Sequence, residues 1–222
     1  MDRCLEPQLV DNPESVKVLA ESFSQVEADF FLSCLENYFQ DDVFLESLDL
    51  CCGTGDFDIV LANNKSTNIH AVDGSSLVLE VAKQNILNAG LENRITTQQL
   101  FVPFLIEKKY DFIFSLNSLH HFHDPNHFWS TIKNHSKDGT KVLVIDIHRP
   151  ASKEIAKEVV DFYETDESSH HRTDAYNSLL AAFESEEIIK QLKDLPLNLN
   201  VETTTTRFNG FYIIVVWGTV KL

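Results

Sequence analysis

The chain of 222 residues has few basic residues and no long apolar run. Lys and Arg number 18 against 34 Asp and Glu, so the formal net charge is −16. Phosphate backbones repel such a surface, which argues against broad nucleic-acid binding. The longest apolar run, residues 211–217, has the length of a strand and falls well short of the ~20 residues that a membrane-spanning helix needs. We therefore expect neither a nucleic-acid partner nor a membrane span.

Cysteine is also scarce, at positions 4, 34, 51 and 52 only, and no CxxC motif occurs. Cys51 and Cys52 are adjacent and poorly placed to bridge each other, so neither a disulfide framework nor a zinc ribbon is expected. The histidines lack carboxylates or cysteines at metal-ligand spacing, and we predict no metal site. Residues 1–6 show no basic region followed by an apolar one, so no signal peptide is expected. A reduced, cytoplasmic setting fits these features.

From residue 46 onward, short apolar runs alternate with amphipathic segments. Five strands are expected at residues 47–51, 68–72, 94–100, 111–116 and 141–147, and a terminal hairpin at residues 200–208 and 211–220. Asn209-Gly210 between the last two strands is a strong hairpin signal. Such alternation predicts an α/β fold with a mostly parallel sheet and helices on both faces. Two helical stripes precede it, so we divide the chain into an N-terminal helical extension, 1–45, and a main domain, 46–222.

A glycine turn follows the first strand of this main domain. Asp49 lies in the strand, Gly53 and Gly55 form the turn, and Asp73 lies at the tip of the second strand. An acid about 20 residues past such a turn is placed to accept hydrogen bonds from ribose hydroxyls. A dinucleotide site needs a third glycine where this chain has Asp58, and a carboxylate is a poor neighbour for a diphosphate. S-adenosylmethionine (SAM) carries no phosphate and suits the pattern better.

Residues 48–55 resemble motif I of class I SAM-dependent methyltransferases. They are particularly similar to the ubiquinone/menaquinone-biosynthesis C-methyltransferase subgroup and its small-molecule relatives. The resemblance implies a Rossmann-like, seven-stranded, mostly parallel sheet with a C-terminal antiparallel hairpin strand, and SAM as cofactor. By the resemblance, the cofactor-binding positions are Asp49, Cys51, Cys52, Gly53, Thr54, Gly55, Asp73, Gly74, Ser75, Gln98, Gln99, Leu100 and Asn117. The family's first glycine is Cys51 here, so we expect the backbone at Cys51 to avoid dihedrals that only glycine adopts.

Two motifs that are missing from the sequence narrow the range of possible methyl acceptors. No Pro-Pro occurs, which argues against the amino-methyltransferases that carry an Asn/Asp-Pro-Pro-aromatic motif. No Pro-Cys occurs, which argues against cytosine-C5 enzymes with their nucleophilic cysteine. Together with the acidic charge, these absences favour a small organic molecule. Methylation at oxygen or carbon is what the subgroup resemblance implies.

Residues that could serve the acceptor follow the fourth and fifth strands, because ligands bind at the carboxyl ends of the strands in such sheets. His121 and His148 are the candidate general bases, although loop or helix-cap roles stay open for both. Candidate substrate-binding residues are Arg149, Tyr163, Arg172, Tyr176 and Asn177. The aromatic residues of the N-terminal helices, Phe23, Phe30, Phe31 and Tyr38, form either a lid that excludes water or ordinary core.

A non-catalytic SAM-binding regulatory or adaptor protein on the same fold is the alternative to an enzyme. Asp49, Gly53, Gly55 and Asp73 favour cofactor binding without proving turnover. An open acceptor pocket beside His121 and His148 would favour an enzyme, and a filled pocket the binding role. The sequence does not decide between a monomer and a homodimer.

Overall fold

The computed structural model of the protein describes residues 1–7, 9–163, 169–208 and 211–222. Its strands are β1 (Glu46–Leu50), β2 (Asn68–Asp73), β3 (Ile95–Gln99), β4 (Tyr110–Leu116), β5 (Ser136–Ile147), β6 (Leu199–Phe208) and β7 (Phe211–Thr219). Its helices are α1 (Pro13–Ser22), α2 (Gln25–Phe39), α3 (Asp56–Asn64), α4 (Ser76–Asn88), α5 (Pro125–His135), α6 (Lys153–Tyr163), α7 (Ser169–Ala181) and α8 (Ser185–Leu192), with a 3₁₀ turn at Leu119–His121.

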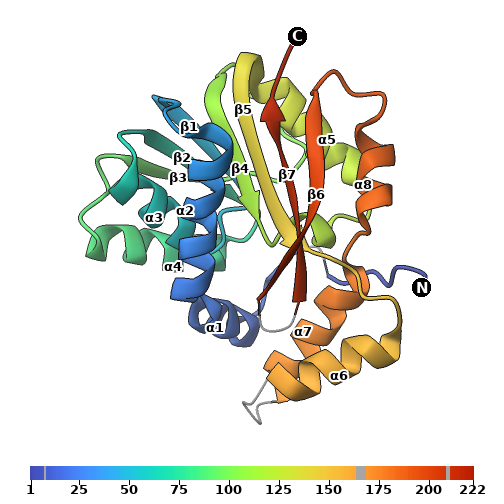
Figure 1. Cartoon of the computed structure of the whole chain (residues 1–222). Helices are drawn as coiled ribbons and strands as arrows, with labels where there is room; N and C mark the ends of the chain where they lie inside the picture. The colour runs from blue at the N-terminus through green and yellow to red at the C-terminus, as the bar shows by residue number, and fades with distance from the viewer. Residues whose placement is uncertain (8, 164–168, 209–210) are drawn as a thin grey trace.

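The seven strands form one sheet in the order β3-β2-β1-β4-β5-β7-β6 (Figure 1). Strands β1 to β5 pair in parallel, and β7 pairs antiparallel with both β5 and β6. The predicted α/β fold with a terminal antiparallel hairpin strand is thus confirmed. The Asn209-Gly210 turn lies outside the described residues. The fifth strand begins five residues earlier than expected, because Ser136 pairs with Tyr110 ahead of a register shift.

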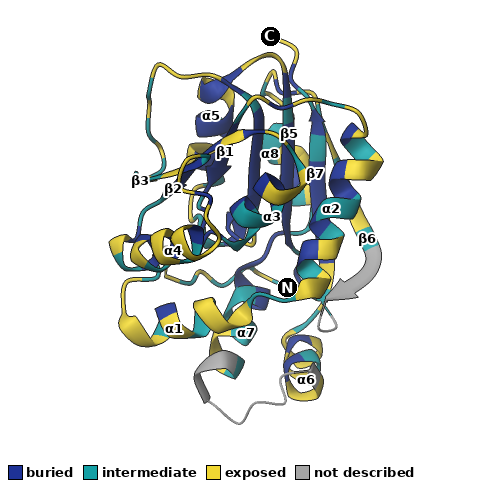
Figure 2. Cartoon of the chain, turned by 90° about the vertical axis from the view of Figure 1, so that its left-hand side faces the viewer, coloured by how far each residue is buried: buried dark blue, intermediate teal, exposed yellow. Residues whose placement is uncertain are grey.

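Helices cover both faces of the sheet, whose strands are largely buried (Figure 2). Helices α2, α3 and α4 pack on one face, where Phe31 and Leu61 meet Phe112. Helices α5 and α8 pack on the other face, where Trp129 and Ile188 belong to a second cluster. Alternate residues of each strand therefore enter different cores, which explains why the buried strands read as nearly continuous apolar runs.

Several helices begin at residues whose side chains cap a helix N-terminus. Asn12 caps α1 ahead of Pro13, and Ser24 forms a capping box with Glu27 at the start of α2. Of the aromatic residues considered for a lid, Phe31 is fully buried in the core, and Tyr38 stacks on Trp217 with ring centroids 4.4 Å apart. These helices are therefore fixed on the sheet by ordinary packing.

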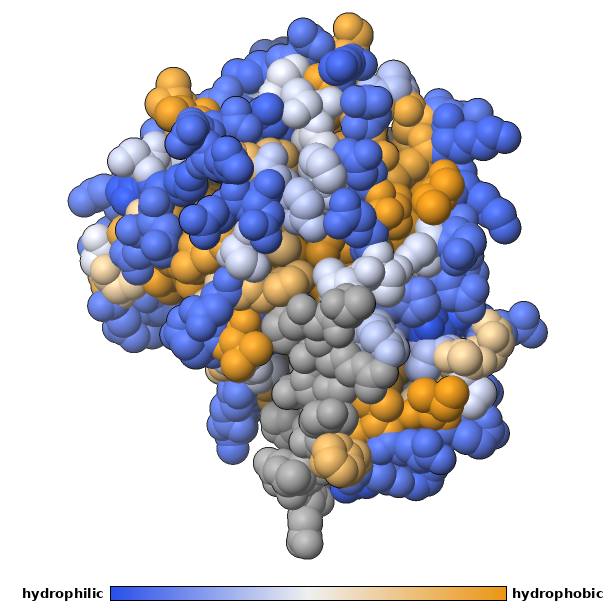
Figure 3. Space-filling model, viewed as in Figure 1, coloured by the Kyte–Doolittle hydropathy of each residue, from blue (hydrophilic) through white to orange (hydrophobic). Residues whose placement is uncertain are grey.

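Helices α6 and α7 lie beyond the carboxyl ends of the parallel strands (Figure 1). The start of the chain runs along them, and Cys4 N donates to Leu180 O at 2.9 Å. On the face drawn in Figure 3, hydrophilic residues predominate and apolar ones form scattered patches. Among the described residues, no helix is both long enough and apolar enough to cross a membrane.

Candidate active site

The turn between β1 and α3 has an unusual backbone conformation. Gly53 and Gly55 have φ of 55° and 79°, which glycine adopts without cost, and Cys51 has φ of 68°. The expectation that Cys51 avoids such dihedrals is therefore wrong. Its carbonyl accepts from Ser118 Oγ at 3.3 Å, and the next amide, Cys52 N, donates to Val72 O at 2.9 Å. These contacts hold a conformation that costs a non-glycine residue about 1–2 kcal/mol.

Asp73 faces this turn from the end of β2. Its Oδ2 accepts from Gly53 N at 3.1 Å, and its Oδ1 accepts from Ser75 N at 2.8 Å. Burial raises the pKa of Asp73, against the effect of these amide donors. Each carboxylate oxygen accepts more than one hydrogen bond, so the fixed carboxylate can still receive the two hydroxyls of a ribose.

Beneath the turn, Asp49 and Asp58 form a buried pair of carboxyl groups. Asp49 is 2% exposed and Asp58 is fully buried. Burial raises the pKa of Asp58 to about 8. Burial and the neighbouring Asp58 raise the pKa of Asp49 as well. Apart from the hydrogen bond that the two side chains share with each other, Asp49 Oδ1 and both oxygens of Asp58 have no hydrogen-bond partner within the described part of the chain. Asp58 is thus the one described donor near Asp49 at the base of the site.

A cavity of about 370 Å³ opens above this turn, at the carboxyl ends of β1, β2 and β4. Its volume lies near the lower end of the range for small-molecule sites. Four carboxylates lie on its wall, from Glu27, Asp49, Asp56 and Asp73, and no described lining residue is Lys or Arg. A cavity with this charge suits a ligand that carries positive groups.

Most of the predicted cofactor positions lie on this cavity. Its wall includes Asp49, Cys51, Cys52, Gly53, Thr54, Asp73, Gly74, Leu100 and Asn117. Gly55 and Ser75 lie beside it in the turn and at the α4 cap, without lining it. The side chains of Gln98 and Gln99 are engaged elsewhere: Gln98 Oε1 lies 2.9 Å from His70 Nε2, and Gln99 Nε2 donates to Gly74 O at 2.8 Å.

The N-terminal segment supplies further wall residues. Leu9, Val10 and Glu27, which the sequence analysis did not name, line the cavity together with the lid candidate Phe23. Asn117 Nδ2 donates to Glu27 Oε1 at 3.4 Å, and burial raises the pKa of Glu27. The capping box at Ser24 signals a helix start in the sequence, but it does not reveal that the helix reaches the end of β4.

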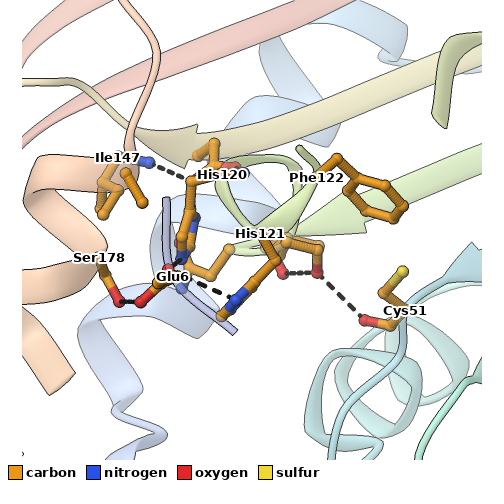
Figure 4. Close-up of polar contacts among 12 residues, drawn as sticks. Glu6, Cys51, His120, His121, Phe122, Ile147 and Ser178 are labelled. Carbon is orange, nitrogen blue, oxygen red and sulfur yellow. Dashed lines mark hydrogen bonds and ion pairs between the residues drawn. The ribbon is translucent and has the colours of Figure 1, made fainter. Parts of the chain in front are cut away.

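A cluster of acids and histidines lies next to the cavity, around the 3₁₀ turn after β4 (Figure 4). His120 Nδ1 lies 2.6 Å from Asp146 Oδ1, and His120 Nε2 lies 3.3 Å from Glu6 Oε1. Burial alone would lower the pKa of His120, but Asp146 and Glu6 outweigh it and raise that pKa. Burial and the neighbouring His120 lower the pKa of His121. His121 lines the cavity, so the turn joins the cluster to the cofactor site.

The other predicted acceptor residues do not line the cavity. His148 forms an isolated parallel bridge with Phe183. Arg149 is 4% exposed and pairs with Glu184 and Glu187, and Arg172 pairs with Asp161. Tyr176 and Asn177 are half-buried in α7, and the side chain of Tyr163 lies outside the described part of the chain. The structure thus brings His121 to the cavity and leaves Arg149 in a structural ion pair.

The residues of the cavity wall fit SAM. Its sulfonium and ammonium groups match the acidic wall, its ammonium can donate to Asp49, and its ribose can donate to Asp73. Gly53 has no side chain, so a ligand can approach the backbone of the turn closely there. A Cβ added at Gly53 would meet only Leu19 Cδ2, at 3.9 Å.

Known proteins that are similar to this chain include methyltransferases. Residues 48–142, somewhat less than half of the chain, match a family model described as a methyltransferase domain. No curated protein matches the sequence. Among solved structures, a candidate O-methyltransferase from Nostoc punctiforme is 20% identical with a TM-score of 0.63, over 87% of this chain and 56% of that one. The chain therefore spans little more than half the length of the Nostoc protein.

Two further structures match over most of both chains. The plantazolicin methyltransferase BpumL, solved with a triazolic desmethyl-plantazolicin analogue and S-adenosylhomocysteine, is 11% identical with a TM-score of 0.70, over 95% of this chain and 92% of that one. A SAM-dependent methyltransferase from Aquifex aeolicus is 14% identical with a TM-score of 0.65, over 94% and 99%. The more specific resemblance to the ubiquinone/menaquinone C-methyltransferase subgroup has no counterpart among these matches. Residues 48–142 therefore match a methyltransferase domain, within a chain that has the Rossmann-like fold of these solved methyltransferases.

Proposed function

We propose that the chain transfers the methyl group of SAM to an oxygen or a carbon of a small organic acceptor. The observation that carries this proposal is the acidic cavity at the glycine turn, where Asp49 and Asp73 face a space with no described Lys or Arg on its wall. A diphosphate would be repelled there, whereas a sulfonium and an ammonium would be attracted. Oxygen as the methylated atom agrees with the name of the Nostoc protein, and carbon agrees with the resemblance of the motif.

SAM, when bound, supplies a methyl group on a positively charged sulfur. In the proposed step the acceptor atom attacks the methyl carbon in line with the carbon–sulfur bond, and the sulfur keeps the electron pair of that bond. The protein contributes alignment and exclusion of water. Leu9, Val10 and Phe23 line the cavity from the N-terminal side, and we assign them the lid function.

Removal of a proton from the acceptor is assigned to His121, whose lowered pKa keeps the imidazole neutral and able to accept a proton but makes it a weak base. Of the two histidines considered, His121 lines the cavity, and His148 does not. The side chain of His121 is 28% exposed, so it can exchange a proton with solvent after each reaction. General-base catalysis requires such a group within hydrogen-bond reach of the acceptor.

Isothermal titration calorimetry with SAM tests the cofactor part of the proposal. We expect micromolar binding of SAM, no binding of NADH, and binding weakened on the order of tenfold or more in Asp73→Ala, because the variant loses charge-assisted hydrogen bonds to the ribose. Replacement of the exposed Asp194 by Ala is the matched control and should leave the affinity unchanged. Equal heats for NADH and SAM, or no heat with SAM, would sink the proposal. With binding established, formation of S-adenosylhomocysteine across a panel of phenols and carbon acids identifies the acceptor.

A further inference from the structure

Three potential metal ligands converge beside the cofactor cavity, although they come from distant parts of the chain. Glu6 Oε1 lies 3.3 Å from His120 Nε2 and 3.4 Å from His121 Nδ1 (Figure 4). One ligand atom from each residue lies within 4.8 Å of the others. The side chains of Glu6 and His120 are only 8% and 4% exposed.

The two distances from Glu6 Oε1 to the imidazole nitrogens match the edges of a metal coordination sphere. Two ligands that each lie ~2.1 Å from a tetrahedral ion are separated by about 3.4 Å. In a metal site each imidazole nitrogen directs its lone pair at the ion. The carboxylate oxygen of the neighbouring ligand therefore lies off the axis of that lone pair, where a hydrogen bond to the nitrogen would be poorly aligned. Consistent with this, Glu6 Oε1 is buried and has no hydrogen-bond partner among the described residues, despite the two nearby imidazole nitrogens.

Further residues hold these ligands in place. His120 Nδ1 lies 2.6 Å from Asp146 Oδ1. Asp146 is itself fixed, because Oδ2 accepts from His120 N at 2.9 Å and Oδ1 accepts from Ile147 N at 2.7 Å. Ser178 Oγ donates to Glu6 Oε2 at 3.3 Å. A carboxylate behind a histidine ligand, and a hydrogen bond behind a carboxylate ligand, are the arrangements that orient metal ligands in proteins.

We propose that Glu6, His120 and His121 bind one divalent transition-metal ion of the Zn²⁺ class. Two imidazole nitrogens and one carboxylate oxygen suit this class better than Mg²⁺ or Ca²⁺, which prefer oxygen ligands throughout. Without the ion, His121 Nδ1 lies 3.0 Å from Pro7 O and can donate a hydrogen bond to it, so binding displaces a proton from that nitrogen. Local spacing in the sequence gave no reason to expect this site, because Glu6 lies far from the histidines along the chain.

The site adjoins the cavity, because His121 belongs to both. Its role in methyl transfer rests on the proposed function. An ion on His121 Nδ1 leaves the proton of the ring on Nε2, so the imidazole of the metal-loaded chain cannot take the proton of the acceptor, and the base role of His121 belongs to the metal-free chain. Metal binding itself is independent of methyl transfer and can be measured without SAM or acceptor.

The test is calorimetric titration of the full chain with Zn²⁺ alone, after treatment with a chelator. We expect one Zn²⁺ per chain, no binding of Mg²⁺, and affinity reduced on the order of tenfold or more in Glu6→Gln. Glu6→Gln keeps the shape of the buried side chain, and His121→Ala, at a partly exposed position, should give the same loss. His127→Ala is the control, because His127 pairs with Asp124 on the surface at 3.8 Å and should bind Zn²⁺ like the parent chain.

Co²⁺ absorption separates this site from the cysteines. Nitrogen and oxygen ligands should give only the weak bands of a Co²⁺ ion without sulfur ligands. A strong thiolate charge-transfer band would place the ion on a cysteine and overturn the proposal. Failure to bind Zn²⁺, or equal affinity in Glu6→Gln and the parent chain, would overturn it as well. If Zn²⁺ binds as expected but SAM does not, the metal site stands and the proposed methyl transfer fails.

Discussion

Replacing Asp58 by Asn should stabilise the protein by about 3 kcal/mol at pH 6 and about 5 kcal/mol at pH 8. Asp58 is fully buried, and Asp49 is the one hydrogen-bond partner of its side chain among the described residues. Burial raises the pKa of Asp58 to about 8 in the folded chain, whereas the unfolded chain releases this proton near pH 4. The stability associated with this group is therefore fully present below pH 4 and is lost as the pH rises toward 8. Asparagine does not ionise, so the variant avoids this loss of stability with pH, and its amide N–H can donate a hydrogen bond to Asp49.

Chemical denaturation at pH 6, 7 and 8 measures this effect. The free energy of unfolding of the parent chain should fall with pH more steeply than that of Asp58→Asn. The difference should approach 1.4 kcal/mol per pH unit, the value for one proton. Asp194→Asn, at an exposed position, should show the slope of the parent chain. Parallel slopes for Asp58→Asn and the parent chain would mean that Asp58 is already ionised in the folded protein.

The sequence predicted the parts of this fold that local signals determine. The Gly53–Gly55 turn between a buried strand and a helix, and the acid at the end of the second strand, follow from residue type and spacing alone. The antiparallel pairing of β6 with β7 also follows, since Phe208 pairs with Phe211. These features depend on contacts within about thirty residues of chain or on one turn.

The features that the sequence did not reveal depend on distant contacts. Glu6 meets His120, and Glu27 meets Asn117, only because the N-terminal segment crosses the carboxyl ends of the strands. No periodicity in residues 1–45 indicates that crossing. The positive φ of Cys51 was missed for a related reason: backbone contacts from β2 and the turn after β4 impose it, and the side chain does not favour it. Site prediction from motifs therefore named residues of the turn that line the cavity, and it missed wall residues that another segment supplies.

Arg149→Met should lower the free energy of unfolding by about 3 kcal/mol. The Arg149 side chain is 4% exposed, and its Nη2 lies 3.0 Å from oxygens of both Glu184 and Glu187. Its Nη1 donates to Ala182 O at 3.2 Å. Burial alone would lower the pKa of Arg149, but the two glutamates raise it, so the guanidinium stays charged. Methionine fills most of the volume but removes the guanidinium donor from the carbonyl and from both carboxylates, which keep only their backbone donors in the capping box. About one third of each glutamate side chain is exposed, which keeps the cost at the lower end for a broken buried pair.

This variant also decides between the two roles considered for Arg149. A residue that anchors the start of α8 to the end of β5 should change stability and leave the affinity for SAM unchanged. A residue that binds an acidic acceptor should change the KM for that acceptor and leave the denaturation midpoint near that of the parent chain. Arg172→Met, at a more exposed ion pair with Asp161, is the matched control and should cost less than about 0.5 kcal/mol. Denaturation in urea at pH 7 measures both variants. A loss below about 1 kcal/mol for Arg149→Met would contradict the structural role, because a buried guanidinium with three acceptors cannot be removed so cheaply.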